Sequence, residues 1–294
     1  MINTQEQYIK HYLETGTYDA IYHPGWSGDW ISGSKAATSA MQQALIAEVE
    51  RRTKGLDLPD IPVLDLHLFT RNKVAPMVNG LFPETERANV LSMLEKSVVF
   101  LTADRIAEIL CRTSWLSTAW KLANLYLLSM GAELLSDAAP RIVGLSEETA
   151  CYVSYEYFTH QDENRFADFV VHEAAHVFHN CKRYTVGLPE TRTREFLLNI
   201  DFRQRETFAY ACEVYSRILE LADNRKARLK LLAEVKEEFV PPDDSVDLEK
   251  FWTALSVAAS TRNGWKQILQ ICAPPKPATN ILKTGYESLI GSSK

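Results

Sequence analysis

The residues with the clearest chemical potential form a His-Glu-x-x-His motif at His172, Glu173 and His176. In an α-helix, residues four apart lie one turn apart on the same face, so both imidazoles can reach a single ion. Glu173 follows His172 by about 100° of rotation, which places its carboxylate beside an open coordination position. Zinc lowers the pKa of a bound water to about 7, and a neighbouring Glu can accept the proton. The spacing therefore predicts metal-assisted hydrolysis with Glu173 as general base.

The residues around the motif favour this interpretation. Val170, Ala174, Val177 and their apolar neighbours cover one arc of the predicted helix, and the two histidines point away from it. His179 shares the histidine stripe, but it lies about 10 Å along the axis from His172. We expect His179 to be a surface residue near the helix C-terminus, where the helix dipole favours it. The alternative is a helix that carries two polar histidines on a solvated face.

A hydrolytic zinc site needs three protein ligands and one open position. The acidic residues downstream of the motif are Glu190, Glu195, Asp201, Glu206, Glu213 and Glu220. Glu206 is favoured because it lies opposite the apolar face of its helix, with the small Ala209 one turn further on. Arg217 follows Glu213 by four residues, which predicts an exposed ion pair, so Glu213→Gln should cost less than about 1 kcal/mol and no metal. Glu213 and Asp201 remain the alternative third ligands.

Residues 172–176 (HEAAH), followed about 30 residues later by residues 206–209 (ETFA), resemble the gluzincin branch of the zincin metallopeptidases. The resemblance covers roughly residues 149–221. It implies a zincin-like core in which both motif histidines and Glu206 bind Zn²⁺ and Glu173 is the general base. It also implies that the strand before the motif helix is an exposed edge that pairs with an extended peptide substrate. That strand is predicted at residues 149–158.

One position departs from the thermolysin-like members of that branch. They carry an Asp four residues after the ligand Glu, which orients a zinc histidine, whereas this chain has Tyr210. The orienting group must come from elsewhere, and Asp168 and Asp201 are the candidates. A donor to the developing oxyanion is also expected. The candidates for that donor are Tyr210, His160, Tyr157 and Arg203.

The elements that would position these residues indicate a helix-rich α+β fold with a small sheet. Helices are predicted at 5–13, 34–52, 83–96, 115–135, 164–180, 202–222, 225–238 and from 248, with a further one capped by Thr102. Strands are predicted at 61–69, 141–145 and 149–158, and residues 97–101 are either a short strand or a continuation of the helix before them. The expected organisation is a mainly helical region at 1–138, a zincin-like core at 139–240 and a helical region at 241–294.

Composition limits the function classes. The chain has 294 residues, 46% of them hydrophobic and 24% charged, and a net charge of −6, which argues against a nucleic-acid partner. No apolar run approaches the roughly 20 residues of a membrane span, and the N-terminus lacks the pattern of a secretory signal. The five cysteines include no CxxC pair, which favours reduced thiols in the cytoplasm. The predicted function is a zinc metallopeptidase; the alternative is a helical interaction module whose metal motif is structural or vestigial.

Overall fold

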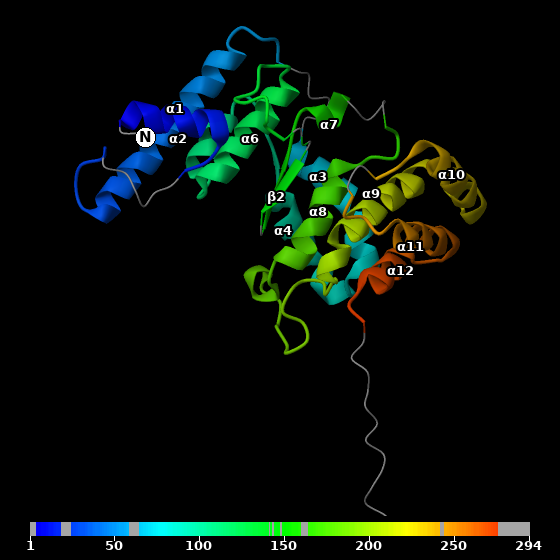
Figure 1. The fold of residues 1–294 in the computed structure, drawn as a ribbon. Helices are drawn as coiled ribbons and strands as arrows, with labels where there is room; N and C mark the ends of the chain where they lie inside the picture. Colours follow the sequence, from blue (N-terminus) through cyan, green and yellow to red (C-terminus); the bar gives the residue numbers. More distant parts are fainter. Residues whose placement is uncertain are drawn as a thin grey trace, which may run out of the picture.

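In the computed structural model, helices pack around a small sheet (Figure 1), which confirms the predicted helix-rich α+β class. The structure describes residues 4–18, 25–58, 65–140, 142, 144–147, 149–159, 164–241 and 244–275. Its elements are α1 (Gln5–Thr15), α2 (Trp30–Thr53), α3 (Leu66–Leu81), α4 (Glu84–Ser97), β1 (Val98–Phe100), α5 (Ile106–Arg112), α6 (Leu116–Ser129), β2 (Gly144–Glu147), β3 (Ala150–Val153), α7 (Glu156–Thr159), α8 (Phe169–Asn180), η2 (Arg183–Val186), η3 (Phe202–Gln204), α9 (Arg205–Leu221), α10 (Arg225–Glu238), α11 (Leu248–Ser260) and α12 (Gly264–Cys272), where η marks a 3-10 helix.

The sheet has the strand order β1-β3-β2. β3 pairs with β1 in parallel and with β2 in antiparallel orientation. The prediction that residues 149–158 form an exposed edge is therefore wrong. The strand ends at Val153, the chain turns into α7, and β3 has a partner on each side. Since a strand paired on both sides has no free backbone groups, a peptide could pair only with an outer strand, and β2 is the outer strand that packs beside α8.

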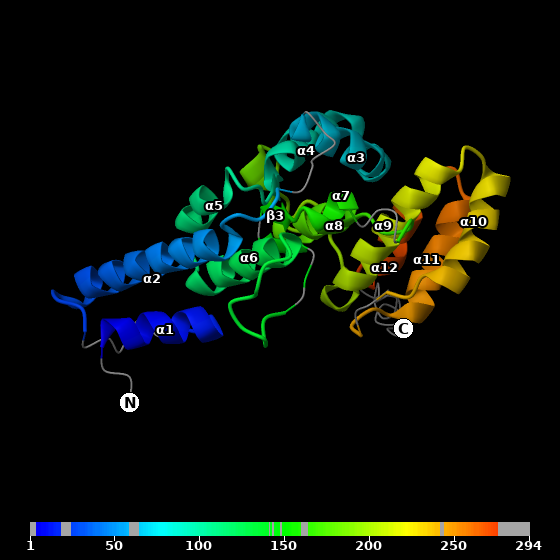
Figure 2. The ribbon, with the colours of Figure 1, turned by 90° about the horizontal axis from the view of Figure 1, so that it is seen from above.

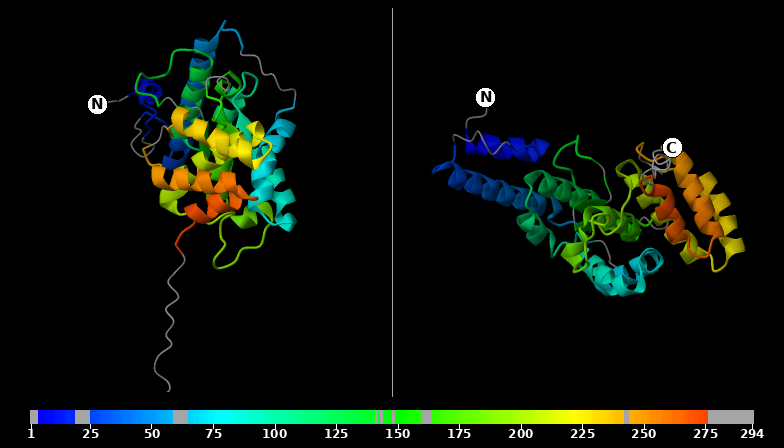
Figure 3. Two further views of the ribbon diagram at one scale, coloured as in Figure 1. Left: turned by 90° about the vertical axis from the view of Figure 1, so that its right-hand side faces the viewer. Right: turned by 90° about the horizontal axis from the view of Figure 1, so that it is seen from below.

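Two hydrophobic cores lie on the two faces of this sheet. Alternate strand residues point to opposite faces, so Val98 and Val153 belong to one core while Val99 and Tyr152 pack against the other. The first core contains residues of α3, α4, α8, α9, α10, α11 and α12. The second core contains residues of α1, α2, α5 and α6. Seen from above, α1 and α2 lie at one end of the molecule and α10 to α12 at the other (Figure 2), and two further views agree (Figure 3).

These cores do not follow the predicted division at residues 138/139 and 240/241. α3 and α4 come from the N-terminal third of the chain, but they share a core with α8. α11 and α12 pack against α9, so the C-terminal helices also belong to that core. The three-part division of the chain stays a prediction, and the site helices are enclosed by segments from all three of its parts.

Most predicted helices are found within a few residues of their expected ends, and the differences have local causes. Residues 61–64 of the expected strand 61–69 lie outside the described residues, whereas its later part belongs to α3. There Asp65 caps the helix by accepting from the backbone N–H of Leu68 at 2.9 Å. α6 ends before Gly131, whose φ of 64° favours glycine and stops the helix.

The prediction that Thr102 caps a helix is wrong. α5 begins only at Ile106, with Arg105 at the cap position and no side-chain capping bond. Thr102 instead starts a turn, in which its carbonyl oxygen accepts from the backbone N–H groups of Arg105 and Ile106. In the part of the chain that the structure describes, no helix is long and apolar enough to cross a membrane.

Candidate metal centre

α8 carries both motif histidines and is buried along most of its length. Asp168 begins the helix, because its carboxylate accepts from the backbone N–H of Val171 at 3.3 Å. Every residue from Val170 to His179 is buried, and His172 and His176 are each 7% exposed. The alternative of two histidines on a solvated face is therefore wrong. Their imidazoles need partners inside the protein, since buried polar groups are costly without them.

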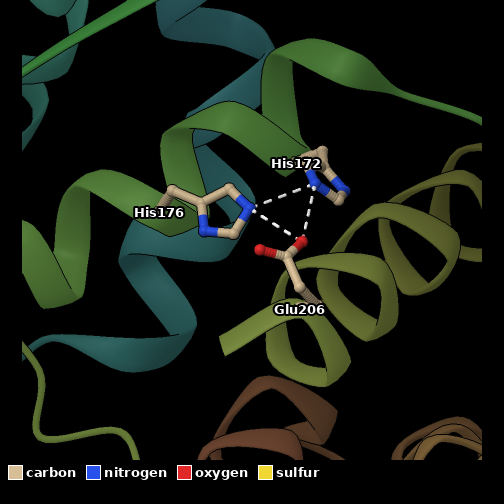
Figure 4. Close-up of side chains that lie close together, drawn as sticks. All are labelled: His172, His176 and Glu206. Carbon is tan, nitrogen blue, oxygen red and sulfur yellow. Dashed lines mark hydrogen bonds and ion pairs between the residues drawn. The ribbon is translucent and has the colours of Figure 1, made fainter. Parts of the chain in front are cut away.

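The two imidazoles converge with Glu206, which α9 brings against α8 (Figure 4). The Nε2 atoms of His172 and His176 are 3.1 Å apart, and Glu206 Oε2 lies 3.7 Å from the first and 3.3 Å from the second. A circle through three such atoms has a radius of about 2.0 Å, which is close to the roughly 2.0–2.1 Å of zinc bonds to nitrogen and oxygen. Among the described residues, these three form the single cluster found with spacing suited to a metal ion.

Small side chains allow the two helices to approach. Ala174 and Ala175 of α8 and Ala209 of α9 are fully buried. The side chain of Glu206 keeps 32% of its surface exposed, whereas the two histidine side chains are almost fully covered. Three protein ligands are the number that a hydrolytic zinc site uses, whereas a structural zinc site has four.

The spacing of Glu213 to Arg217 predicts a surface position for Glu213, and this prediction is wrong. Its side chain is 1% exposed and lies behind His172. One carboxylate oxygen accepts from His172 Nδ1 at 3.0 Å, and the other accepts from the backbone N–H of Asp168 at 2.8 Å. Arg217 pairs with Glu220 instead. The sequence does hold a sign of this placement. Glu213 follows Glu206 by seven residues, which puts the two side chains within about 20° of each other around the helix and therefore on the same face.

This contact determines which nitrogen of His172 faces the cluster. An ionised carboxylate can only accept, so Nδ1 of His172 carries a hydrogen and Nε2 is the nitrogen that faces His176 and Glu206. An imidazole held in this way can bind a metal through Nε2 once that nitrogen has lost its own hydrogen. Glu213 therefore supplies the orienting group that the sequence assigns to Asp168 or Asp201, and the same contact disfavours it as the third ligand.

Neither of the two predicted orienting carboxylates contacts the ring of a motif histidine. The carboxylate of Asp168 accepts from Lys73 Nζ at 3.0 Å and from the Tyr157 hydroxyl at 3.2 Å. Asp201 accepts from the backbone N–H of Arg203, within η3. Asp168 contributes through its backbone, because its N–H fixes the carboxylate that orients the histidine.

The electrostatic field in the cluster favours a cation. Burial disfavours charge on His172, but hydrogen bonds to the carboxylates of Glu206 and Glu213 outweigh it and raise its pKa to about 10. Burial likewise raises the pKa of Glu206, and the hydrogen bonds to the two histidines outweigh it and hold that pKa well below its usual range. Without an ion the cluster thus retains a proton, and a divalent cation would satisfy the same carboxylates.

His179 is also buried, at 7% exposure, so the prediction of a surface histidine is wrong. Its Nε2 lies 3.5 Å from Nδ1 of His176, on the side away from the cluster. Burial, followed by the charges of His176 and Arg205, lowers the pKa of His179 to about 3, so the ring is neutral. It is buried because the surrounding elements cover the C-terminal turn of α8, which helical spacing alone does not reveal.

Glu173 lies against the sheet, beside the start of β2. A Cβ placed on Gly144 would lie 2.5 Å from Glu173 Oε1 and 2.9 Å from its Cδ, so the carboxylate occupies the space that a side chain would fill. Glu173 is 8% exposed, and its charge adds to the burial that raises the pKa of Cys151 in β3. The side chain of the predicted general base therefore lies in the contact between α8, which carries it, and the start of β2.

Of the four oxyanion candidates, Tyr210 alone contacts a motif residue among those the structure describes. Its ring lies edge-on to that of His172, with the centroids 4.4 Å apart. The Tyr157 hydroxyl donates to Asp168 in the interior, and Arg203 is exposed on η3. His160 lies outside the described residues. The role of Tyr210 in catalysis stays a prediction.

Comparisons of this chain with known protein families, with characterised proteins and with solved structures gave no match. Membership in the gluzincin branch therefore stays a prediction that rests on the motif residues.

Proposed function

We propose that this chain is a zinc-dependent metallopeptidase in which His172, His176 and Glu206 hold the ion and Glu173 is the general base. The observation that carries the proposal is the convergence of three ligand atoms that lie 3.1, 3.3 and 3.7 Å from one another, because a point about 2 Å from each of them is at a common zinc–ligand distance. The carboxylate of Glu213 supports it, because it holds His172 in the tautomer that a metal requires.

Bound zinc would polarise a peptide carbonyl and acidify a water molecule. Glu173, which follows His172 on the same helix, would accept the proton of that water and later give it to the leaving amine. Tyr210, whose ring lies against His172, is the candidate donor to the oxyanion. β2 offers an extended substrate its outer edge, because its other edge pairs with β3.

The test compares the wild-type chain with Glu173→Gln. Both proteins are loaded with zinc, incubated with a denatured proteome and analysed for new peptide termini, while their zinc content is measured by elemental analysis. The amide is nearly isosteric but cannot take up the proton, so we expect one zinc per chain in both proteins and about 10²–10⁴-fold slower cleavage in the variant.

A matched control is Glu195→Gln, which removes one carboxylate from an exposed pair with Lys182. It should cleave at the wild-type rate. Equal cleavage by Glu173→Gln would overturn the mechanism. A wild-type chain that binds no zinc, or binds zinc and cleaves nothing, would favour the alternative of an interaction module with a structural or vestigial metal motif.

A further inference from the structure

Arg205 is the first residue of α9 and directly precedes the candidate ligand Glu206. In the described part of the chain, its guanidinium makes no ion pair or hydrogen bond, and its Nε is buried without an acceptor. Buried donors without partners are rare in proteins and usually have an explanation. A positive charge in the first turn of a helix is also disfavoured by the helix dipole. The placement of Arg205 therefore does not serve the stability of α9.

Three other basic side chains on or near the site helices differ from Arg205, because they have acidic partners. Arg183 binds Glu86, Lys182 binds Glu195 and Arg217 binds Glu220. Arg205 instead stacks on the ring of Phe202, at 4.1 Å from the centroid, and Phe202 is 72% exposed. Stacking on an aromatic ring restricts a guanidinium while leaving its N–H groups free to bind an acceptor.

A second buried donor lies at the same end of the cluster. When His176 binds an ion through Nε2, its Nδ1 carries the hydrogen and faces His179 Nε2. His179 Nε2 then accepts, so the hydrogen of that ring is on Nδ1, which is buried without a partner among the described residues. Arg205 is joined to Glu206, whose carboxylate lies 3.3 Å from the His176 ring that His179 contacts. Near the cluster, Arg205 and His179 thus each present an N–H donor that no described residue accepts.

The nearest carboxylate does not satisfy them. Glu206 turns its oxygen toward the two motif histidines, at 3.3 and 3.7 Å, so it is engaged in the ligand cluster. An anionic acceptor for Arg205 must therefore come from outside the described residues. A carboxylate fits best, because its two oxygens match the planar fork of a guanidinium.

We infer that Arg205 and His179 form a subsite for a carboxylate of the peptide substrate, next to the candidate metal ligands. The inference rests on the proposed peptidase function and names its substrate class. The carboxylate belongs either to an acidic side chain near the cleaved bond or to the C-terminus of the peptide. These two sources share one chemistry, and the experiment separates them.

The experiment uses the full zinc-loaded chain and sets of matched peptides built on a bond that the wild-type protein cleaves. One peptide carries Glu near that bond, one carries Gln there, and each is made with a free and with an amidated C-terminus. The enzymes are wild type, Arg205→Gln, Arg205→Lys and the control Arg192→Gln, which removes an exposed charge that has no assigned role. Zinc content and melting temperature are recorded for each.

We expect Arg205→Gln to lower kcat/KM for the carboxylate-bearing peptide about 10–100-fold, chiefly through KM, and to leave the neutral peptide unchanged. Arg205→Lys should recover part of the loss, because the charge remains but the planar fork does not. If the wild-type kcat/KM falls when Glu is replaced by Gln in the peptide, the carboxylate belongs to an acidic side chain. If it falls when the C-terminus is amidated, the carboxylate is that of the C-terminus. Equal effects on charged and neutral peptides, or none, would overturn the subsite. A wild-type chain that cleaves no bond refutes the proposed function instead.

Discussion

Replacing Glu213 by Gln tests the reasoning about the candidate site most directly. The carboxylate accepts two buried hydrogen bonds, from the backbone N–H of Asp168 at 2.8 Å and from His172 Nδ1 at 3.0 Å. The amide keeps the shape but has one acceptor oxygen. If that oxygen stays on Asp168, an amide N–H faces His172 and pushes its hydrogen to Nε2, where the metal should bind. If the amide turns over, the backbone N–H of Asp168 loses its acceptor.

The expected magnitude follows from either outcome. Leaving one buried donor unsatisfied costs about 1–3 kcal/mol. Losing a group that orients a ligand histidine typically weakens metal binding about 10–100-fold, which corresponds to about 1.4–2.8 kcal/mol. The first figure applies to the stability of the fold and the second to zinc affinity, so the variant should show both effects. We therefore expect the zinc Kd of Glu213→Gln to rise by one to two powers of ten, with the fold retained.

The assay is competition for zinc against a chromophoric chelator of known affinity, at fixed pH and ionic strength. Glu220→Gln is the matched control, because it makes the same change on the same helix. Glu220 pairs with Lys73 and Arg217 rather than with a motif histidine, so its variant should bind zinc like the wild type. A Glu213→Gln protein whose Kd lies within a factor of two of that control would refute the assigned role.

Three further outcomes follow from the structure. Gly144→Ala should displace the Glu173 carboxylate, because the new Cβ would lie 2.5 Å from its oxygen. It should lower kcat about 10²-fold while zinc is retained. The control is Gly33→Ala, whose new Cβ would meet its nearest neighbour at 3.6 Å, and it should leave kcat unchanged. Glu86→Gln should destabilise the fold by about 3–5 kcal/mol in denaturant titrations, because it leaves the guanidinium of Arg183, 1% exposed, without its partner. Zinc at 100 times its Kd should stabilise the metal-free chain by about 2.7 kcal/mol, seen as a higher melting temperature that a chelator reverses; an unchanged melting temperature would count against the site.

The parts of the site that the sequence predicts are those fixed by helical geometry. His172 and His176 belong to one turn of α8, so their spacing alone brings the two rings together. Glu206 could be chosen because small residues mark where two helices approach. Glu213 was misassigned, since an Arg four residues later is the usual mark of a surface pair, and helical spacing does not say which face a neighbouring helix covers.

The sheet shows the same limit. β3 pairs with β1, from which it is separated by about 50 residues, and no local pattern encodes that partner. The apolar and aromatic residues of 149–158 indicate a strand correctly, but they do not tell a central strand from an edge. They also continue into α7, where Tyr157 is buried through its contact with Asp168 rather than through strand pairing.

Because the ligand cluster is divided between α8 and α9, its residues are synthesised at different times. During synthesis at about 5–20 residues per second, Glu206 is made roughly 2–7 seconds after His172. α11 and α12, which pack on α9, are made later still. The local histidine pair is therefore present before the helix that completes the triangle can dock. We expect zinc uptake to follow the assembly of this core rather than to nucleate it, so a newly made chain must hold α8 in place through its apolar contacts alone.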